Sequence, residues 1–263
     1  MPFPERKRVV YKKNPLDRVI CQLRFPAILR IETEIPAEFQ ERIRRDFPNF
    51  IEKSEFQVEM PMGTPGQSTL EFPIQLSPKP NKNYQFSSEN ESWVFNLTRS
   101  FVALTSSNYT RWEQFKVKLS NPLKAFLEIY SPEYFPRIGL RYIDIIKRSK
   151  LGLDDVSWNE LLQPYVLGML STDNVGKNIA SYECKNEIKL EDETSVVRII
   201  TSLIQETETG EVCFLIDSDF FTTAKTTIDD AINKLDYFNT RGSRLIQWCI
   251  TERLHNAMEP ETL

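Results

Sequence analysis

Residues 138–146 read I-G-L-R-Y-I-D-I-I, an apolar, strand-like run that begins the second half of the chain. Residues 19–25, V-I-C-Q-L-R-F, hold the same place in the first half. Each run is followed by a helix-like segment, then by a series of strand-like runs, and then by another helix-like segment. A chain that repeats strand, helix, meander and helix indicates internal duplication with a pseudo-twofold relation between its halves.

In the first half, a helix is predicted behind Pro36, because proline is favoured at the first helical position and Phe39, Ile43 and Phe47 then recur every four residues. Strand-like runs follow at residues 56–60, 70–76, 84–87 and 93–104. A second helix is predicted from Trp112 onward. We expect it to kink or restart at Pro122, because proline supplies no amide hydrogen for the helical ladder.

The second half is expected to follow a linker at residues 131–136, S-P-E-Y-F-P. Ser157 and Glu160 have the spacing of a capping box, which predicts a helix from there to about Leu170. An antiparallel meander is then predicted at residues 179–190, 194–205 and 211–217. The last helix should begin near Thr226. Gly242 in its middle predicts a bend or a close packing contact, since glycine costs about 1 kcal/mol against alanine there.

These elements predict an α+β protein with two pseudo-equivalent halves, residues 1–132 and 133–263. Each half would be a strand, a helix, an antiparallel meander and a long helix packed on one face of the sheet. This order resembles helix-grip and TATA-binding-protein-like folds. The resemblance is one of topology, and a shared fold does not carry function with it.

Charge is distributed unevenly along a chain whose formal net charge is −4. Residues 1–135 contain 19 Lys and Arg against 16 Asp and Glu, whereas residues 136–263 contain 14 against 21. Such asymmetry suits docking onto a protein partner or head-to-tail association, a homodimer included, although drift in surface composition would produce it too. A pI near 5.4 argues against a dedicated nucleic-acid binder.

Several features favour the cytoplasm. The four cysteines are far apart in sequence, which is typical of buried, reduced thiols. Residues 1–13 are polar and basic rather than an apolar signal segment. No run approaches the ~20 apolar residues that a membrane-spanning helix requires.

Catalytic machinery is sparse in this sequence. His255 is the only histidine, which excludes multi-histidine metal sites. Gly63 and Gly66 are the only closely spaced glycines, and no helix-like run follows them as a phosphate-binding loop would require. We therefore predict no catalytic residues and no cofactor, and an enzyme is the less favoured reading.

Arg24, Arg141 and Tyr142 are the candidate ligand-binding residues. Arg24 and Arg141 hold similar places in the first strands of the two halves, where an arginine can bind an anion or cover apolar neighbours with its stem. Arg141 and Tyr142 are adjacent, so in a regular strand they face opposite sides and can share a site only near a strand end or a bulge.

Asp217 and Asp219 are weak candidates for a metal site, at the end of the last meander strand. Two carboxylates hold Mg²⁺ weakly, so Asp144 or Glu252 would have to supply a third oxygen ligand. A polar strand-to-helix corner explains the same residues without a metal. Asp144 shares the strand phase of Tyr142, and an arginine of the pseudo-symmetric strand is a candidate partner for it.

Three segments carry a resemblance to known proteins: residues 11–25 with N-P-L and R-F-P, residues 137–144 with G-L-R-Y, and the C-terminal pattern through E-R-L at 252–254. Together they resemble a sporadically distributed family of uncharacterised prokaryotic proteins of about this length. Sporadic distribution implies accessory genes, such as those of defence or toxin–antitoxin loci. The lone histidine, the lack of a glycine loop or a cysteine cluster, and the charge asymmetry together predict a non-catalytic interaction protein. The alternative is a small-ligand or nucleotide-binding module that uses a cleft between sheet and helix or between halves.

Overall fold

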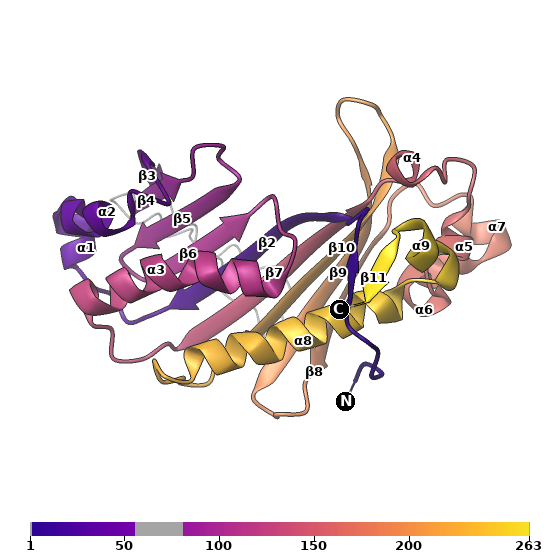
Figure 1. The fold of residues 1–263 in the computed structure, drawn as a ribbon. Helices are drawn as coiled ribbons and strands as arrows, with labels where there is room; N and C mark the ends of the chain where they lie inside the picture. The colour runs from indigo at the N-terminus through magenta and orange to yellow at the C-terminus, as the bar shows by residue number, and fades with distance from the viewer. Residues whose placement is uncertain (1, 56–80, 263) are drawn as a thin grey trace, which may run out of the picture.

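The computed structural model describes residues 2–55 and 81–262. Their main feature is an antiparallel sheet that extends through the whole molecule (Figure 1). Its strands are β2 (Leu16–Arg24), β3 (Asn49–Glu55), β4 (Asn81–Ser87), β5 (Trp93–Thr98), β6 (Phe101–Ser106), β7 (Arg137–Ile146), β8 (Glu183–Lys189), β9 (Ser195–Gln205) and β10 (Val212–Thr222). Their order across the sheet is β3-β4-β5-β6-β2-β7-β10-β9-β8. The predicted α+β class, with a large antiparallel sheet, is confirmed.

β2 and β7, the first long strands of the two halves, lie side by side at the centre of the sheet. They pair antiparallel, with Cys21 opposite Leu140. β6 flanks β2 and β10 flanks β7, so each central strand also pairs with the last meander strand that follows it in the chain. The strands before and after the expected linker at residues 131–136 therefore belong to one continuous hydrogen-bonded sheet.

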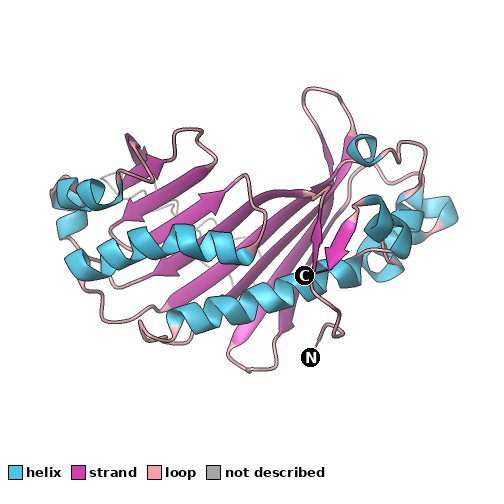
Figure 2. Ribbon diagram, in the orientation of Figure 1, coloured by secondary structure: helices cyan, strands magenta, loops and turns pink. Residues whose placement is uncertain are grey.

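Two long helices, α3 (Trp112–Tyr130) and α8 (Ala231–Cys249), cover one face of the sheet (Figure 2). In α3 the apolar stripe of Phe115, Leu119 and Phe126 is fully buried. α8 lies across β7 and β10. The indole Nε1 of Trp112 donates a hydrogen bond to Asp236, which ties the start of α3 to α8.

The remaining helices are short. They are α1 (Arg30–Thr33), α2 (Ala37–Ile43), α4 (Arg148–Leu151), α5 (Trp158–Leu161), α6 (Pro164–Leu167), the 3-10 turn η1 (Gly168–Ser171), α7 (Asp173–Gly176) and α9 (Glu252–Ala257). Within the described residues, no helix is both long and apolar enough to cross a membrane.

The single helix expected from Ser157 to about Leu170 is wrong. The chain leaves helical geometry at Leu162, which forms a β-bridge with Ile250, and the Gln163 amide donates to the carbonyl of Cys249. Pro164 then begins a new turn. The capping box forms in part only, because the Ser157 hydroxyl bonds the Glu160 carboxylate instead of a backbone amide.

Two further expectations differ from the structure. The run at 93–104 is two strands, because Thr98 accepts hydrogen bonds from the amides of Ser100 and Phe101 and closes a tight turn. α3 continues through Pro122 as one helix. β3 was not predicted, and the strands predicted at 56–60 and 70–76 lie outside the described residues.

The two ends of the described chain meet on the helix-covered side of the sheet. β1 (Val9–Tyr11) pairs antiparallel with β11 (Pro260–Thr262). The Tyr11 hydroxyl is 2.8 Å from His255 Nδ1, which gives the only histidine a structural contact. Phe3 is buried against Trp248. Residues 2–13 therefore form a fixed N-terminal arm.

Candidate functional site

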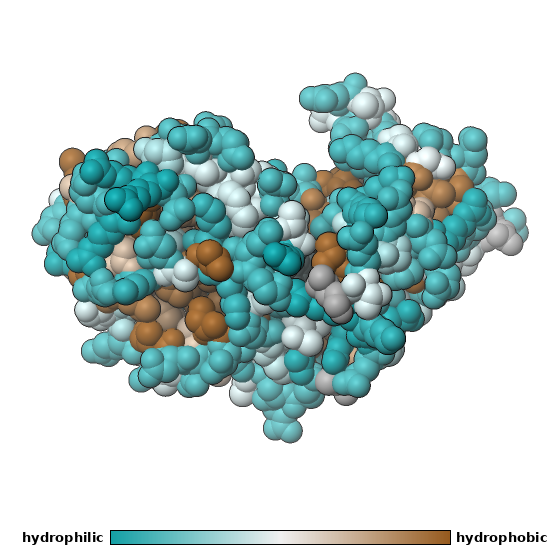
Figure 3. All heavy atoms as spheres, viewed as in Figure 1, coloured by the Kyte–Doolittle hydropathy of each residue, from teal (hydrophilic) through white to brown (hydrophobic). Residues whose placement is uncertain are grey.

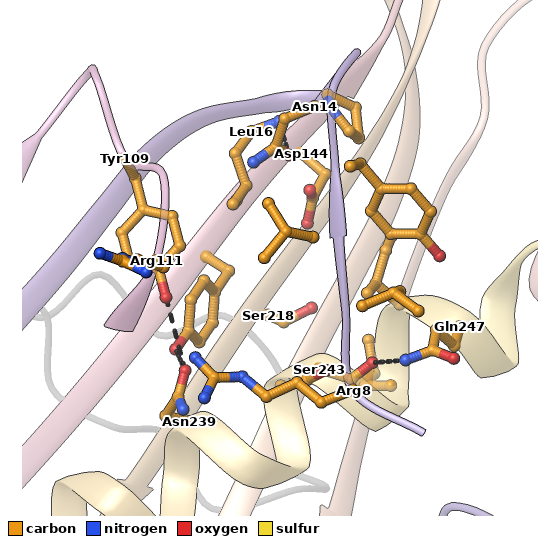
Figure 4. A pocket seen from close by; sticks show the side chains of 18 of the residues that line it. Arg8, Asn14, Leu16, Tyr109, Arg111, Asp144, Ser218, Asn239, Ser243 and Gln247 are labelled. Atoms are coloured by element: carbon orange, nitrogen blue, oxygen red, sulfur yellow. Dashed lines mark hydrogen bonds between the residues drawn. The ribbon is translucent and has the colours of Figure 1, made fainter. Parts of the chain in front are cut away.

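A cavity of about 90 Å³ lies between the N-terminal arm, the sheet and α8 (Figure 4). This is several times the ~10–15 Å³ that one water requires. The sheet supplies Tyr142, Asp144 and Ser218, the arm supplies residues 8–11, and α8 supplies residues from Asn239 to Gln247. Tyr109 to Arg111, the segment that leads into α3, closes one end. The cavity thus lies where the two halves of the chain meet.

Strand geometry explains why these side chains share one face. Tyr142 and Asp144 are two residues apart on β7, so both point to the same side of the sheet. Ser218 on β10 stands directly opposite Tyr142 in the register of the two strands, and directly opposed residues share a face. All three therefore lie beneath the arm and α8.

Asp144 is the most unusual group in the cavity. The residue is 5% exposed, and no hydrogen bond from residues 2–55 or 81–262 to its carboxylate is among the causes that shift its pKa. Burial, with a smaller contribution from the charge of Asp217, raises the pKa of Asp144 to about 7. Burial disfavours the ionised form because a carboxylate loses its hydration in the interior.

Ser218 presents a second unsatisfied group. The residue is 2% exposed, and its hydroxyl has no hydrogen-bond partner among the described residues. Buried polar atoms are nearly always hydrogen-bonded, because an unmet donor or acceptor costs about 1–3 kcal/mol. Asp144 and Ser218 therefore bring two unmet polar groups to one cavity.

The tyrosines at the other end of the cavity have partners. The Tyr142 hydroxyl donates to Asn239 Oδ1 at 3.0 Å, and the Tyr109 hydroxyl lies 3.5 Å from the same atom. Their rings pack edge to face with centroids 6.1 Å apart. Burial raises the pKa of Tyr142 well above its usual value, so this phenol stays neutral.

Two arginines stand at the mouth. Arg8 makes a two-pronged ion pair with Glu113, at 2.6 and 3.0 Å, and this holds the pKa of Glu113 at about 2. Arg111 is exposed, and no ion pair involves it in the described part of the chain. Arg111 therefore gives the mouth of the cavity a positive charge, whereas Asp144 places an acidic group in its interior.

The predicted ligand-binding set does not form one site. Tyr142 lines the cavity, but Arg141 projects from the opposite face of β7, where it stands beside Ile20 of β2. Arg24 shares that opposite face, since it pairs with Arg137 in the same register. The sheet therefore separates Tyr142 from both arginines.

Asp217 and Asp219 lie inside β10 rather than at its end, because the strand continues to Thr222. Arg141 holds Asp217 with two hydrogen bonds, and Arg137 Nη2 bonds Asp219 at 2.8 Å. These carboxylates occupy the face opposite to Asp144. Arg24, the arginine of the pseudo-symmetric strand that was suggested as a partner for Asp144, also lies on that opposite face and therefore does not pair with it. The described residues include no group of three or more potential metal ligands.

Gly242 shows the predicted close packing contact. A Cβ added to it would lie 2.7 Å from Cε2 of Tyr142, closer than atoms can approach. The ring is buried and its hydroxyl is bonded to Asn239, so it has little freedom to move away. Glycine at this position thus lets α8 approach the floor of the cavity.

We predict that Gly242→Ala destabilises the protein by about 1–3 kcal/mol, the usual effect of overpacking, although alanine gains about 1 kcal/mol in helix propensity. Urea unfolding of the variant and the wild type measures the difference. Asn233→Ala, at an exposed position on the same helix, is the matched control and should change little. A Gly242→Ala protein more stable than the wild type would show that helix propensity outweighs the contact with Tyr142.

Comparison with known proteins adds no assignment to this site. No family model matches the chain, and no curated protein matches its sequence. A function for the cavity is therefore inferred from its own residues.

Proposed function

We propose that the protein is a non-catalytic binder of a small polar molecule, held in the cavity between the sheet, the N-terminal arm and α8. The observation that carries this proposal is the pair Asp144 and Ser218 in the wall of one cavity. The buried Ser218 hydroxyl has no hydrogen-bond partner among the described residues, and no hydrogen bond is among the causes that raise the pKa of the buried Asp144. Burial of unmet polar groups costs stability, and a ligand that satisfies them recovers it.

The rest of the lining supports the same function. Val10, Leu16 and Ile246 contribute apolar surface, and a small number of polar groups lie among them. Binding sites for small molecules commonly combine a mainly apolar wall with few convergent polar groups. The arm that closes the cavity is held by the pairing of β1 with β11 and by the buried Phe3, and the ion pair of Arg8 with Glu113 adds a contact at its exposed edge.

Thermal stability in the presence of a panel of small polar molecules tests this proposal. A ligand that binds only the folded state raises its stability in proportion to the logarithm of its concentration. We expect at least one compound class to stabilise the wild type but not Ser243→Phe, which fills the cavity from α8. Thr240→Phe, exposed on the same helix, should respond like the wild type. A panel in which no compound distinguishes the two variants contradicts the proposal.

Protein interaction is a second candidate function, favoured by apolar side chains at the end of the molecule that carries α1 and α2. Leu29 and Ile35 are 64% and 73% exposed, and Phe50 and Ile51 on β3, the last strand of the sheet among the described residues, are also exposed. Phe50 stacks on Tyr84, whose hydroxyl bonds the carbonyl of Glu34, so β3 and the α1–α2 segment lie close together. Apolar atoms reach the surface at this end in Figure 3.

For this second function we propose a protein partner, with a second copy of the chain as the first to test. Sedimentation velocity of the wild type and of Ile35→Glu distinguishes the cases. We expect the wild type to associate as its concentration rises and the variant to remain monomeric, because a buried glutamate opposes association. If the wild type and Ile35→Glu are both monomeric over the same concentration range, a second copy of the chain is not the partner.

We also infer that residues 1–132 and 133–263 arose by duplication into a helix-grip or TATA-binding-protein-like arrangement. The support is that β2 and β7 each pair with the last meander strand of their own half. A cytoplasmic location is proposed from the four free cysteines. The resemblance of the N-P-L, R-F-P and G-L-R-Y segments to a sporadic prokaryotic family extends the proposal to an accessory role in a defence or toxin–antitoxin locus.

A further inference from the structure

We propose that the ligand of the cavity is a small aliphatic zwitterion, with an ammonium group against Asp144 and Ser218 and an anionic group facing Arg111 at the mouth. This inference rests on the proposed function and names the chemical class of its ligand. Figure 4 shows Asp144 and Ser218 on the sheet and Arg111 at the end of the cavity beside Tyr109.

When Asp144 is ionised, the buried end of the cavity requires a hydrogen-bond donor. An ionised carboxylate is an acceptor only, and a serine hydroxyl can accept as well as donate. A neutral donor would leave the charge of Asp144 uncompensated, whereas an ammonium group supplies three donors and the opposite charge. An anion would be repelled by Asp144 and, through the sheet, by Asp217. The buried end therefore selects a cation.

The rest of the cavity determines the other end of the ligand. The hydroxyls of Tyr109 and Tyr142 are both directed to Asn239, so neither is a free donor for the ligand. Arg8 is bound to Glu113, which leaves Arg111 as the exposed positive charge at the mouth. Between the two ends lie apolar side chains that suit methylene groups, Val10, Leu16 and Ile246. A short aliphatic ligand with a positive charge at its buried end and a negative charge at the mouth matches this arrangement of the cavity.

Binding of an ammonium group to Asp144 should release a proton near neutral pH. Burial keeps part of the Asp144 population protonated at pH 7, and only the ionised form pairs with a cation. Several charged or titratable side chains lie around the cavity. They are Arg8 and Tyr11 from the arm, Tyr109, Arg111 and Glu113 at the start of α3, Cys21 from β2, Tyr142 from β7, Cys249 from α8 and, behind the sheet, Asp217 from β10. For a group with a pKa of about 7, affinity should be about tenfold weaker at pH 6 than at pH 8.

Titration calorimetry tests the inference with the ω-amino acids from β-alanine to ε-aminocaproate, each compared with the alkylamine, the alkyl carboxylate and the alcohol of the same length. We expect one ω-amino acid to bind best, its amine to bind more weakly, and the carboxylate and alcohol not to bind. Asp144→Asn should weaken binding by at least about tenfold, as loss of a charge-assisted contact does. Arg111→Gln should abolish the preference for the ω-amino acid over its amine and leave binding of the amine.

Each other result has a definite meaning. If the carboxylates or alcohols bind and Ser243→Phe blocks them, while the amines do not bind, the ligand class is wrong and the cavity remains a binding site. If no member of the series binds, the zwitterion is overturned, and the panel described above decides separately whether the cavity binds another class. If ω-amino acids bind Asp144→Asn and Ser243→Phe as tightly as the wild type, they bind elsewhere and the inference fails.

Discussion

Asp144→Asn should make the folded protein more stable at about pH 8 than the wild type, by as much as about 4 kcal/mol, because about three pKa units separate folded from unfolded Asp144. Asparagine has nearly the same shape and cannot ionise. The wild type, in contrast, must hold a carboxylate that burial disfavours and no described residue bonds. The free energy of unfolding at several pH values, from urea titrations, measures the effect.

The direction of the pH dependence follows from the two pKa values of Asp144. The unfolded chain loses this proton near pH 4, whereas the folded protein keeps it until about pH 7. Between these values the folded state binds more protons, so the contribution of Asp144 to stability falls as the pH rises. The gap between variant and wild type should therefore be small near pH 4, grow up to about pH 7 and then level off.

Asp155→Asn, an exposed replacement of the same kind, is the control and should show no such gap. Parallel stability curves for Asp144→Asn and the wild type, or a variant that is less stable at pH 8, would contradict the assignment of Asp144 as an unsatisfied buried acid. The same substitution is expected to weaken binding of the zwitterion. Functional sites commonly contain a residue that lowers the stability of the folded protein but is required for binding, and Asp144 would be such a residue.

Part of this site could be predicted from the sequence. The alternation within residues 138–146 places Tyr142 and Asp144 on one face and Arg141 on the other, which depends only on local strand geometry. Ser218 could not be found in this way. Its position opposite Tyr142 depends on the register of β10 against β7, and a slip of one residue would turn the other face of β10 toward the helices.

The position of the N-terminal arm could not be predicted from the sequence either, because it too depends on contacts between distant segments. β1 is only Val9–Tyr11, and its pairing partner β11 lies at the other end of the chain. No pattern within either short segment predicts that the two pair. The helix expected from Ser157 failed similarly, because the bridge from Leu162 to Ile250 joins segments distant in sequence and overrides local helix propensity.

Asp217 and Asp219 illustrate a different limit, because a carboxylate at a metal site and one in an ion pair look alike in sequence. In the structure Arg137 lies between Gln22 and Asp219, bonds both, and rests over the ring of Phe221 with 5.0 Å to its centroid. The side chains of Arg137 and Asp219 are 22% and 18% exposed. Burial lowers the pKa of Arg137, while the charge of Asp219 opposes that effect.

We therefore predict that Arg137→Ala destabilises the protein by about 2–3 kcal/mol, somewhat less than removal of one partner from a fully buried pair. The variant leaves Asp219 without its partner and removes one of the two arginines, Arg137 and Arg198, that lie over the ring of Phe221. Adding Asp219→Asn to Arg137→Ala should recover part of the loss, because the unpaired charge is then removed, and a double-mutant cycle measured by urea unfolding gives the coupling energy.

Arg44→Ala is the control for this cycle, since its ion pair with Glu41 is about 60% exposed on both sides and such surface pairs contribute about 0–1 kcal/mol. If Arg137→Ala leaves stability unchanged and the cycle shows no coupling, this face of the sheet does not depend on the pair. Arg137 and Asp219 would then be available to an external ligand, as a binding site on that face requires. A coupling of about 1 kcal/mol or more instead identifies them as part of the structure that holds β2, β7 and β10 together.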